Sequence, residues 1–343
     1  MKVTIVTTMR NEGAHALEWV AHHRAAGVSD FLVYVNDCED GTEELLSLLP
    51  GVHVIRHAPR AQSPQWAALR AAWDHPVVQQ ADWLACLDCD EFININSRLD
   101  DIPDLIERSG ADAILMPWRL FGSNGHVALS PEPVTERFTY AAAPDMLYPA
   151  IGRYFKTLFR RDGPFHQFGV HRPKHKKDGR NAPPVIVDGS GAAVPPSLLN
   201  NSGQIMMWDV PIARDLVQLN HYSVKSAADF MVKRERGLPN HTEKEIGLTY
   251  WVERNFNHVE DATIAHMRAA TARQEDLFLE LPDVALSQKL CRAWNETEFE
   301  RVLSTPDGLQ LFGRLQLANA SAEIDPQDAL ALIKAYRRVN ARR

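Results

Sequence analysis

The chain has 343 residues, of which 45% are hydrophobic and 24% are charged, and its formal net charge is −7. This balance is typical of a soluble globular protein and argues against a nucleic-acid-binding protein, whose surface is usually basic. No window approaches the roughly 18 to 20 uninterrupted apolar residues of a membrane span, and the first residues lack the features of a signal peptide. We therefore expect a cytoplasmic protein with reduced thiols and leave peripheral association with a membrane open.

Strand and helix signals alternate over the first part of the chain. Runs rich in β-branched and aromatic residues predict four strands, at residues 2–9, 30–37, 52–57 and 81–88. Helix-like segments separate them, with Thr42 and Ser63 expected as N-caps. This alternation predicts an α/β fold with a mainly parallel sheet that is covered on both faces.

The pattern loosens after about residue 110. Further strands are expected at 113–121 and 153–160, and the segment 215–237 reads as a strand followed by a helix with Ser226 as its N-cap. Residues 178–204 are rich in turn-forming residues and predict a long surface excursion.

Composition also suggests a division of the chain. From about residue 245 the sequence has a helical composition and ends in the basic run AYRRVNARR. We predict a main domain over 1–240 and a helical C-terminal region over 241–343. Within the main domain, 1–110 is expected to be a nucleotide-binding half and 111–240 an acceptor half.

Polar residues follow three of the predicted strands at the points where those strands end. In open α/β sheets, ligands bind outside the carboxyl ends of the strands, so these residues are expected at one edge of the sheet. Solvated loop residues would also be polar, which is the alternative explanation. The set comprises Thr8, Arg10, Asn11, Glu12, Asn36, Asp37, Asp88, Asp90 and Glu91.

Three of these residues form an acidic cluster within the stretch WLACLDCDEFINI. Asp88, Asp90 and Glu91 repel one another and cost desolvation free energy if they are buried, so they either face water or surround a cation. Residues at i and i+2 of an extended segment project to the same side, so Asp88 and Asp90 can face one site. Hard oxygen ligands suit Mn²⁺ or Mg²⁺, and we therefore predict a divalent cation there.

Six motifs, in order over roughly residues 1–237, resemble a family 2-type glycosyltransferase of the GT-A fold, in the branch with an RNE start and an LDxDEF motif. They are TTMRNEGAHALEWVAHHRAAGV, NDCEDGTEELL, WLACLDCDEF, PWRLFGSNGH, ERF and HYSVKSAADFMVKRERG. The resemblance implies a GT-A-like, Rossmann-type mixed sheet flanked by helices. It also implies a UDP- or GDP-linked sugar donor, a glycan or other hydroxyl acceptor, and inverting transfer in glycan or surface polysaccharide synthesis. Asp88 and Asp90 would place Mn²⁺ or Mg²⁺ on the donor diphosphate.

The resemblance also implies which residues line the donor pocket. The family often has an Asp at the position of Val35, so the identity of the nucleotide stays open. Gln65 and Arg70 lie on the helix from which similar enzymes approach the donor, although a surface location explains them equally well. The pocket residues implied by the resemblance are Thr8, Arg10, Asn11, Glu12, Asn36 and Asp37.

Two residues of the stretch NHYSVKS are candidates for contacts with the metal and the diphosphate. His221 follows a predicted strand and matches the place where many GT-A enzymes supply a further metal ligand, whereas a satisfied structural histidine is the alternative. Lys225 lies four residues later and could neutralise diphosphate oxygens as a point charge.

Inverting transfer requires a base that takes the proton of the acceptor hydroxyl. His171 is the residue we expect in this role, with Glu91 as the second choice and His166 and Glu136 as rivals. For Glu136 a salt bridge is the simpler explanation. Trp118 is expected either to stack on a sugar or to lie in the core.

Two other functions fit parts of the sequence. A sugar nucleotidyltransferase would share the fold and the metal, but it would need a glycine-rich phosphate loop after the first strand, and TTMRNEGA does not supply one. A degenerate, non-catalytic binder of nucleotides or sugars is the second alternative. Val35 and the uncertain base favour it, whereas the intact pair Asp88 and Asp90 argues against it.

Overall fold

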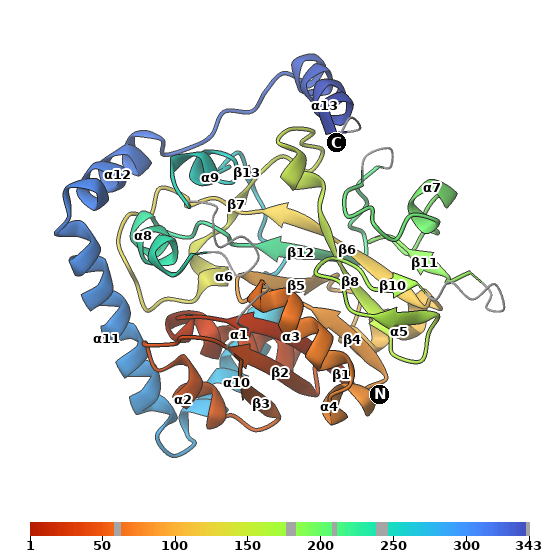
Figure 1. The fold of residues 1–343 in the computed structure, drawn as a ribbon, viewed down its shortest axis with the longest axis horizontal. Coiled ribbons are helices and arrows are strands. Elements are labelled where there is room, and N and C mark those ends of the chain that lie inside the picture. The colour runs from red at the N-terminus through yellow and green to blue at the C-terminus, as the bar shows by residue number, and fades with distance from the viewer. Residues whose placement is uncertain (58–62, 176–182, 208–210, 238–245, 341–343) are drawn as a thin grey trace.

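The computed structural model describes residues 1–57, 63–175, 183–207, 211–237 and 246–340. Figure 1 shows a central sheet flanked by helices, with the C-terminal helices running up one side of the molecule and over its top. The predicted α/β class, with a mixed sheet and a helical C-terminal extension, is confirmed.

Four neighbouring parallel strands form the first half of the sheet. They are β1 (Val3–Met9), β2 (Asp30–Val35), β3 (Val52–Arg56) and β4 (Trp83–Cys86), in the order β3-β2-β1-β4. The helices between them are α1 (Gly13–Ala25), α2 (Thr42–Ser47), α3 (Pro64–Trp73) and α4 (Pro76–Gln79). All four predicted strands are therefore confirmed, with their carboxyl ends at one edge of the sheet.

The second half of the sheet is mixed, so the mixed sheet that the resemblance implied is confirmed, and the parallel arrangement predicted from the alternation holds for the first half. Its strands are β5 (Glu91–Ile95), β6 (Ala113–Leu120), β8 (Phe155–Arg160), β11 (Ile186–Val187) and β12 (Val217–His221). β8 lies antiparallel between β4 and β6, while β12 pairs parallel with β6 and antiparallel with β5. A strand that returns directly beside its neighbour, without a crossover helix, is antiparallel, and the local pattern does not reveal such returns.

Three local predictions need correction. Helix α2 begins after Gly41, which has a φ of 86°, so Thr42 is not its N-cap; the Thr42 hydroxyl instead donates to Asp40 at 2.6 Å. The strand β5 was not predicted, because its first residue belongs to the acidic cluster. Of the predicted surface excursion 178–204, residues 178–182 lie outside the described residues, and the described part is not wholly on the surface, since the buried pair Ile186–Val187 adds a strand to β6.

Ser226 is confirmed as the N-cap of α8 (Ala227–Arg236). Its hydroxyl accepts a hydrogen bond from the Asp229 backbone N–H at 3.1 Å, and the Asp229 carboxylate accepts one from the Ser226 backbone N–H at 3.3 Å. This reciprocal capping box fixes the start of a helix whose side chains reach the candidate site.

Helices also pack on both faces of the sheet. One buried cluster joins the sheet to α1, to α5 (Ile102–Ser109) and to α10 (Ala265–Leu279), and the other joins it to α3 and α4. Helix α10 is tied to α1 by the pair His22 Nδ1 and Thr271 Oγ1 at 3.2 Å. Gln288 of α11 (Val284–Leu303) donates to the backbone carbonyl of Ala14 at 3.1 Å, so the C-terminal helices rest directly on the first helix.

The remaining elements are short or peripheral. They are α6 (Val134–Arg137), β7 (Tyr140–Ala141), a 3₁₀ turn (Ala150–Arg153), β9 (Phe165–Gln167), β10 (Lys174–His175), α7 (Pro196–Leu199), α9 (Leu248–Val252), β13 (Val259–Glu260), α12 (Pro306–Leu317) and α13 (Pro326–Asn340). Across the described ranges, every helix falls short of the length and apolar character that crossing a bilayer demands. Helix α13 stands at the top of Figure 1, at the end of an extended segment that follows α12.

Candidate functional site

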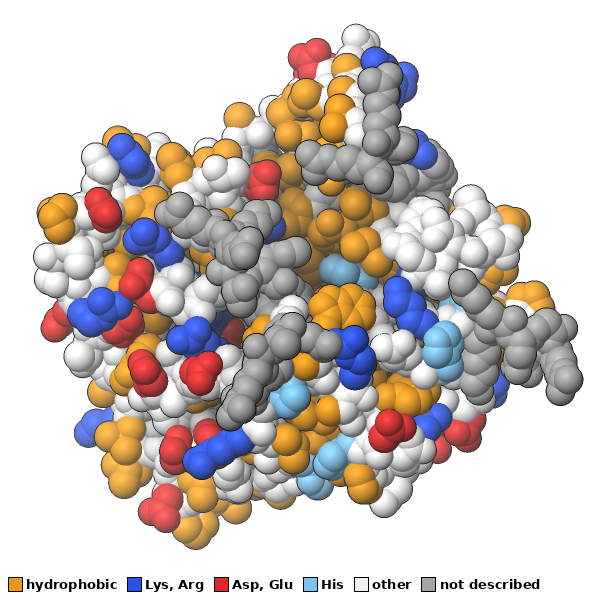
Figure 2. Space-filling model, viewed as in Figure 1, with side chains coloured by type: hydrophobic (Ala, Val, Ile, Leu, Met, Phe, Trp, Pro, Cys, Tyr) orange, Lys and Arg blue, Asp and Glu red, His pale blue; other side chains and the backbone are white. Residues whose placement is uncertain are grey.

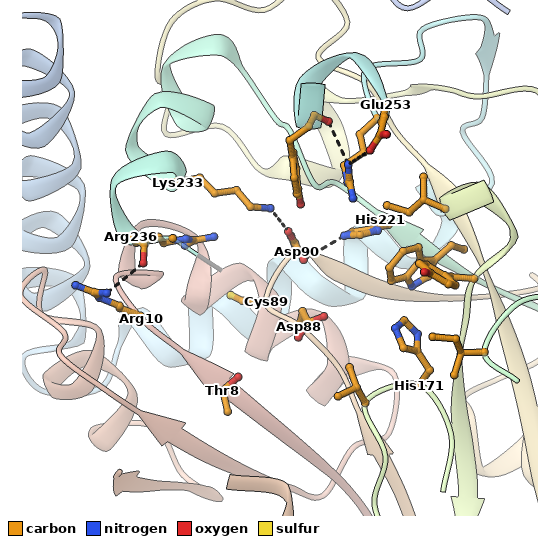
Figure 3. Close-up of a pocket in the computed structure, with 18 of the residues that line it drawn as sticks. Thr8, Arg10, Asp88, Cys89, Asp90, His171, His221, Lys233, Arg236 and Glu253 are labelled. Carbon is orange, nitrogen blue, oxygen red and sulfur yellow. Dashed lines mark hydrogen bonds and ion pairs between the residues drawn. The ribbon is translucent and has the colours of Figure 1, made fainter. Parts of the chain in front are cut away.

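A cavity of about 850 Å³ lies at the carboxyl ends of the parallel strands. The strand-end residues of the first half of the sheet line one side of it, and Figure 3 shows Asp88 and Asp90 beside this space, while the Arg10 guanidinium donates to the Arg236 carbonyl at 3.2 Å. Of the predicted site residues, the cavity brings together Thr8, Arg10, Glu12, Asn36, Asp88, Asp90, His171 and His221.

Asp90 is the most strongly held carboxylate of the cavity. It is buried, and its Oδ2 accepts a hydrogen bond from Lys233 Nζ at 2.6 Å, while its Oδ1 lies 3.5 Å from His221 Nε2. Burial by itself raises the pKa of Asp90, but the positive charge of Lys233 and the contact with His221 hold this pKa well below its usual range. Asp90 is therefore an anion near neutral pH.

Asp88 lies two residues earlier and is more open. Its side chain is 31% exposed, and its two carboxylate oxygens accept hydrogen bonds from Gln65 Nε2 at 2.8 Å and from Lys156 Nζ at 3.0 Å. Gln65 is buried on α3 and does not line the cavity, so it orients Asp88 from behind. Asp88 therefore presents an oriented carboxylate to the space of the cavity.

Glu91 lies below the floor of the cavity rather than in it. Its side chain is fully buried, and its Oε2 accepts a hydrogen bond from the Asp88 backbone N–H at 2.8 Å. Burial raises the pKa of Glu91 to about 8, even though the Lys156 ammonium at 3.3 Å favours the charged form. A carboxyl group in this position shapes the turn that carries Asp88 and has no path to an acceptor hydroxyl.

Lys156, which the sequence analysis did not single out, connects these two carboxyl groups. It lies on β8 in the middle of the sheet, and its side chain is fully buried. Burial lowers the pKa of Lys156, but the Asp88 and Glu91 carboxyl groups outweigh this effect and hold the pKa above its ordinary value. The signal in the sequence is a single Lys within the apolar strand FKTLFR, because a charge in a central strand requires a buried partner.

An aromatic cluster forms the next part of the cavity wall. The Trp118 ring centroid lies 4.2 Å from that of His221, 5.5 Å from that of His171 and 5.2 Å from that of Tyr154. Trp118 is buried but lines the cavity, and so combines the two roles that the sequence left open for it. Its ring holds both histidines in fixed positions.

The hydrogen bond of His171 determines which of its two ring nitrogens carries the proton and which one keeps its lone pair. His171 Nδ1 lies 2.9 Å from the Phe155 carbonyl oxygen, which can only accept, so Nδ1 carries the proton. The other nitrogen, Nε2, is then an acceptor. Burial and the nearby Lys156 ammonium lower the pKa of His171 to about 3, so the imidazole is neutral near pH 7.

Five predicted residues do not line this cavity. Asn11 and Lys225 instead line a second, small cavity between α1, α8 and α11, and Lys225 has a φ of 53° just before the N-cap of α8. Lys233, further along the chain, lies beside Asp90 and lines the main cavity instead of Lys225. The residues outside the main cavity are Asn11, Asp37, Gln65, Glu91 and Lys225.

The rivals for the role of base lie elsewhere. His166, on β9, and Glu136, on α6, are both exposed, and neither lines the main cavity. Arg70 is exposed on α3.

The far side of the cavity consists mainly of aromatic and aliphatic side chains, which the sequence analysis missed. Arg254 is the main charged group among them, and its guanidinium lies 3.7 Å from the centre of the Tyr250 ring and 3.3 Å from Glu253. Tyr336 reaches this wall from α13, far along the chain. The far side comprises Tyr148, Pro149, Ile151, Tyr154, Val170, Ile205, Tyr250 and Tyr336.

Two donor atoms of the site lie at a spacing that suits a divalent cation. Within the described ranges, no three His, Cys, Asp or Glu side chains converge as a ready-made metal site. Asp90 Oδ1 and His221 Nε2 nevertheless lie 3.5 Å apart. This is close to the roughly 3 Å that separates neighbouring ligands of an octahedral ion with bonds of about 2.1 Å. The buried His221 Nδ1 has no hydrogen-bond partner in the described structure. Asp90 and His221 thus fit one cation, with Asp88 close by and open to the cavity.

Sequence comparison relates the chain to glycosyltransferases over part of its length. No protein-family model matches it. A glycosyltransferase family 92 protein of Oryza sativa subsp. japonica is 23% identical over 163 residues, which cover 43% of this chain and 28% of that protein. A family 92 protein of Ricinus communis is 27% identical over 104 residues, which cover 29% of this chain and 18% of that protein. The matched regions therefore span less than a third of either relative.

Two solved structures resemble the chain distantly. Staphylococcus aureus TarS is 12% identical with a TM-score of 0.31, and the match covers 90% of this chain and 82% of that one. HddC from Yersinia pseudotuberculosis is 10% identical with a TM-score of 0.29, and the match covers 55% of this chain and 91% of that one. Neither similarity is close enough to support a functional argument.

Proposed function

We propose that the chain is a glycosyltransferase that moves a sugar from a nucleotide-sugar donor to the hydroxyl group of an acceptor. The observation that carries the proposal is that Asp88 and Asp90, at the end of β4, face the same cavity as the ends of β1 and β2. The similarity to family 92 glycosyltransferases supports the same class of reaction. The cavity of about 850 Å³ is of the size that holds a small-molecule substrate.

The donor is assigned to the polar side of the cavity. Thr8 and Asn36 offer hydrogen-bonding groups for a nucleoside, and Glu12 is held in place by an ion pair with Arg236 at 2.6 Å. Lys233 lies beside Asp90 and offers a positive charge to a diphosphate. UDP- and GDP-linked sugars are both candidates, because these polar groups do not distinguish the two bases.

A divalent cation, Mn²⁺ or Mg²⁺, is part of the proposal. Asp90 and His221 would hold it, with Asp88 nearby, and when bound it would act as a Lewis acid that stabilises the leaving diphosphate. Lys156 and Lys233 already balance the charges of the two aspartates. The site therefore stays folded and oriented when no cation is present.

His171 is proposed to accept the proton of the acceptor hydroxyl. Its Nε2 carries a lone pair, and the bond from Nδ1 to the Phe155 carbonyl fixes the direction of the ring. The imidazole lies in the wall between the donor side and the aromatic side, which is where an acceptor hydroxyl must approach the sugar. Inversion is the stereochemical outcome expected when the base and the leaving group lie on opposite faces of the sugar.

Hydrolysis of the donor tests this function without knowledge of the acceptor. The wild type should slowly release nucleoside diphosphate from at least one UDP- or GDP-sugar when Mn²⁺ is present. Asp90→Asn should lower this rate by at least about 100-fold, because it removes the charge of the central carboxylate. Asp82→Asn is the matched control, since Asp82 lies at the opposite end of the same strand and is exposed.

Two results would contradict the proposal. One is the absence of hydrolysis across the donor panel together with unchanged melting temperatures in the presence of nucleotides. The other is an equal rate for Asp90→Asn and Asp82→Asn. Binding of a nucleoside diphosphate without turnover would instead indicate the non-catalytic binder that the sequence left as an alternative.

A further inference from the structure

The last helix of the chain has an apolar stripe that begins inside the cavity and continues outside it. Ala329 and Ile333 of α13 are buried, and Tyr336, one turn further, lines the cavity. Leu332 and Val339 lie at positions i−4 and i+3 from Tyr336, so they share its side of the helix, and they are 42% and 59% exposed. The stripe therefore leads from the cavity wall to the surface.

The cavity wall next to this stripe is also apolar. Tyr148, Ile151, Tyr154 and Ile205 line the same cavity as Tyr336. In Figure 2, hydrophobic side chains surround the hollow between the C-terminal helix at the top and the body of the molecule. An apolar surface that continues from a binding cavity onto an exposed helix can contact a ligand with a long apolar part along its length.

The opposite side of α13 is basic. Lys334 and Arg338, four residues apart, are exposed on the side away from the stripe. From the start of α13 at Pro326 to residue 343 the sequence contains five basic residues and one acidic residue, Asp328 in the first turn, in a chain whose net charge is −7. This segment therefore has the opposite charge to the protein as a whole, and it complements an anionic surface.

We propose that α13 is a contact helix for an anionic lipid bilayer, and that it turns the aromatic side of the cavity toward acceptors carried by lipids. A helix with an apolar stripe and a basic polar face lies in the interface of a membrane rather than across it. Basic residues near an anionic surface each contribute to binding, and the exposed apolar residues add to it. The part concerning the acceptor rests on the proposed transferase function, whereas the membrane contact does not.

Sedimentation with phosphatidylcholine vesicles, with and without phosphatidylglycerol, tests the membrane contact on the full chain and without donor. The wild type should bind the vesicles that contain phosphatidylglycerol and not the neutral ones. Lys334→Gln combined with Arg338→Gln should weaken this binding by about 30-fold, since each basic residue contributes about 1 kcal/mol. Donor hydrolysis by this variant should stay at the wild-type rate, so a failure of the membrane contact is distinguishable from a failure of the transferase.

Matched controls lie on the neighbouring helices. Lys289→Gln combined with Arg314→Gln removes two cations from α11 and α12 and should leave vesicle binding unchanged. Leu332→Ser combined with Val339→Ser should weaken binding by about 10-fold, because two apolar side chains leave the interface. Leu286→Ser combined with Leu290→Ser, which alters two α11 residues that are 57% and 59% exposed, should have no effect.

Three results would overturn the inference. One is wild-type protein that does not bind vesicles containing phosphatidylglycerol, and another is equal loss in the α13 variants and their controls. The third is a wild type that is a dimer and does not bind vesicles, together with a Leu332→Ser, Val339→Ser variant that is a monomer. This result would show that the apolar stripe contacts a second copy of the chain. If the Leu332→Ser, Val339→Ser variant does not fold, vesicle binding by the Lys334→Gln, Arg338→Gln variant is the deciding measurement. That variant is expected to fold because Lys334 and Arg338 are exposed.

Discussion

The two sides of the cavity are built in different ways. The proposed donor side consists of residues at or just after the carboxyl ends of neighbouring parallel strands, so Thr8, Asn36 and Asp90 reach one edge of the sheet through local geometry. The aromatic side is assembled from distant parts of the chain, from Tyr148 in a loop to Tyr336 in the last helix. Short sequence motifs therefore predict the residues of the donor side. The residues of the aromatic side come together only when distant segments pack in the folded chain.

The charges follow the same division. On the donor side each aspartate has its own lysine, Asp88 with Lys156 and Asp90 with Lys233. On the aromatic side Arg254 stacks on Tyr250 and contacts Glu253, while most neighbours are uncharged. This difference predicts that the donor is polar and that the part of the acceptor bound here is largely apolar. Substitutions on each side test the difference, and they are given from the largest expected effect to the smallest.

Replacing the buried lysine of the donor side should have the largest effect. Lys156→Met leaves Asp88 and Glu91 without their shared cation, and removal of one member of a buried ion pair costs about 3–5 kcal/mol of unfolding free energy. Urea denaturation near neutral pH measures this loss. Arg160→Met is the control on the same strand, since it breaks a half-exposed pair with Asp112 and should cost less than about 1 kcal/mol. Similar losses in the two variants would show that Lys156 does not carry the charge balance of this side.

Next in size is the effect of removing the proposed base. Asn has an amide nitrogen near the position of His Nδ1, so His171→Asn keeps the donor to the Phe155 carbonyl and removes Nε2. The turnover rate should fall by about 100-fold, within the range for loss of a general base. His166→Asn, on the exposed β9, should retain the wild-type rate. If His171→Asn also retained full turnover, the histidine would have only a structural role.

The pH dependence of kcat/KM examines the same residue in the free enzyme. A base must be unprotonated to act, and burial and Lys156 lower the pKa of His171 to about 3. The fraction of neutral His171 therefore stays high as the pH falls from 8 to about 5, and the rate should fall only at lower pH. An acidic limb centred near pH 6.5, the ordinary value for histidine, would contradict the environment described for this residue.

The smallest effect concerns the second proposed ligand of the cation. His221→Ala should weaken Mn²⁺ binding in the presence of a nucleoside diphosphate by about 10-fold, a loss of about 1.4 kcal/mol. Calorimetric titration with Mn²⁺ measures it, again with the exposed His166→Ala as control. An unchanged Mn²⁺ affinity combined with a lower melting temperature would assign His221 to the packing around Trp118.

The sequence predicts the donor side well because its signals are local. Apolar runs revealed the strands β1 to β4, and their polar ends identified Asp88 and Asp90. By contrast, the sequence did not predict β5. Its first residue, Glu91, is part of the acidic cluster, which suggested a polar loop, although the strand is fully buried. Lys225 was expected at the diphosphate because of its distance from His221 along the chain. The structure directs Lys225 into a second cavity and brings Lys233 to Asp90 instead.

The aromatic side offered no comparable signal. Tyr154 and Tyr336 line one cavity only because the extended segment after α12 carries the last helix to the top of the molecule, and a single sequence does not reveal this placement. Lys156 is an intermediate case, since its place in an apolar strand could have indicated a buried partner although not which one.

Calorimetric titration of UDP and GDP, with and without Mn²⁺, most directly tests the central claim that Asp90 organises a donor site. The wild type should bind at least one of the two nucleotides, more tightly with Mn²⁺ than without it. Asp90→Asn should lose the part of the affinity that depends on Mn²⁺, while Asp82→Asn should match the wild type. The claim would be contradicted if the wild type bound neither nucleotide, or if Asp90→Asn bound as tightly as Asp82→Asn with the same dependence on Mn²⁺.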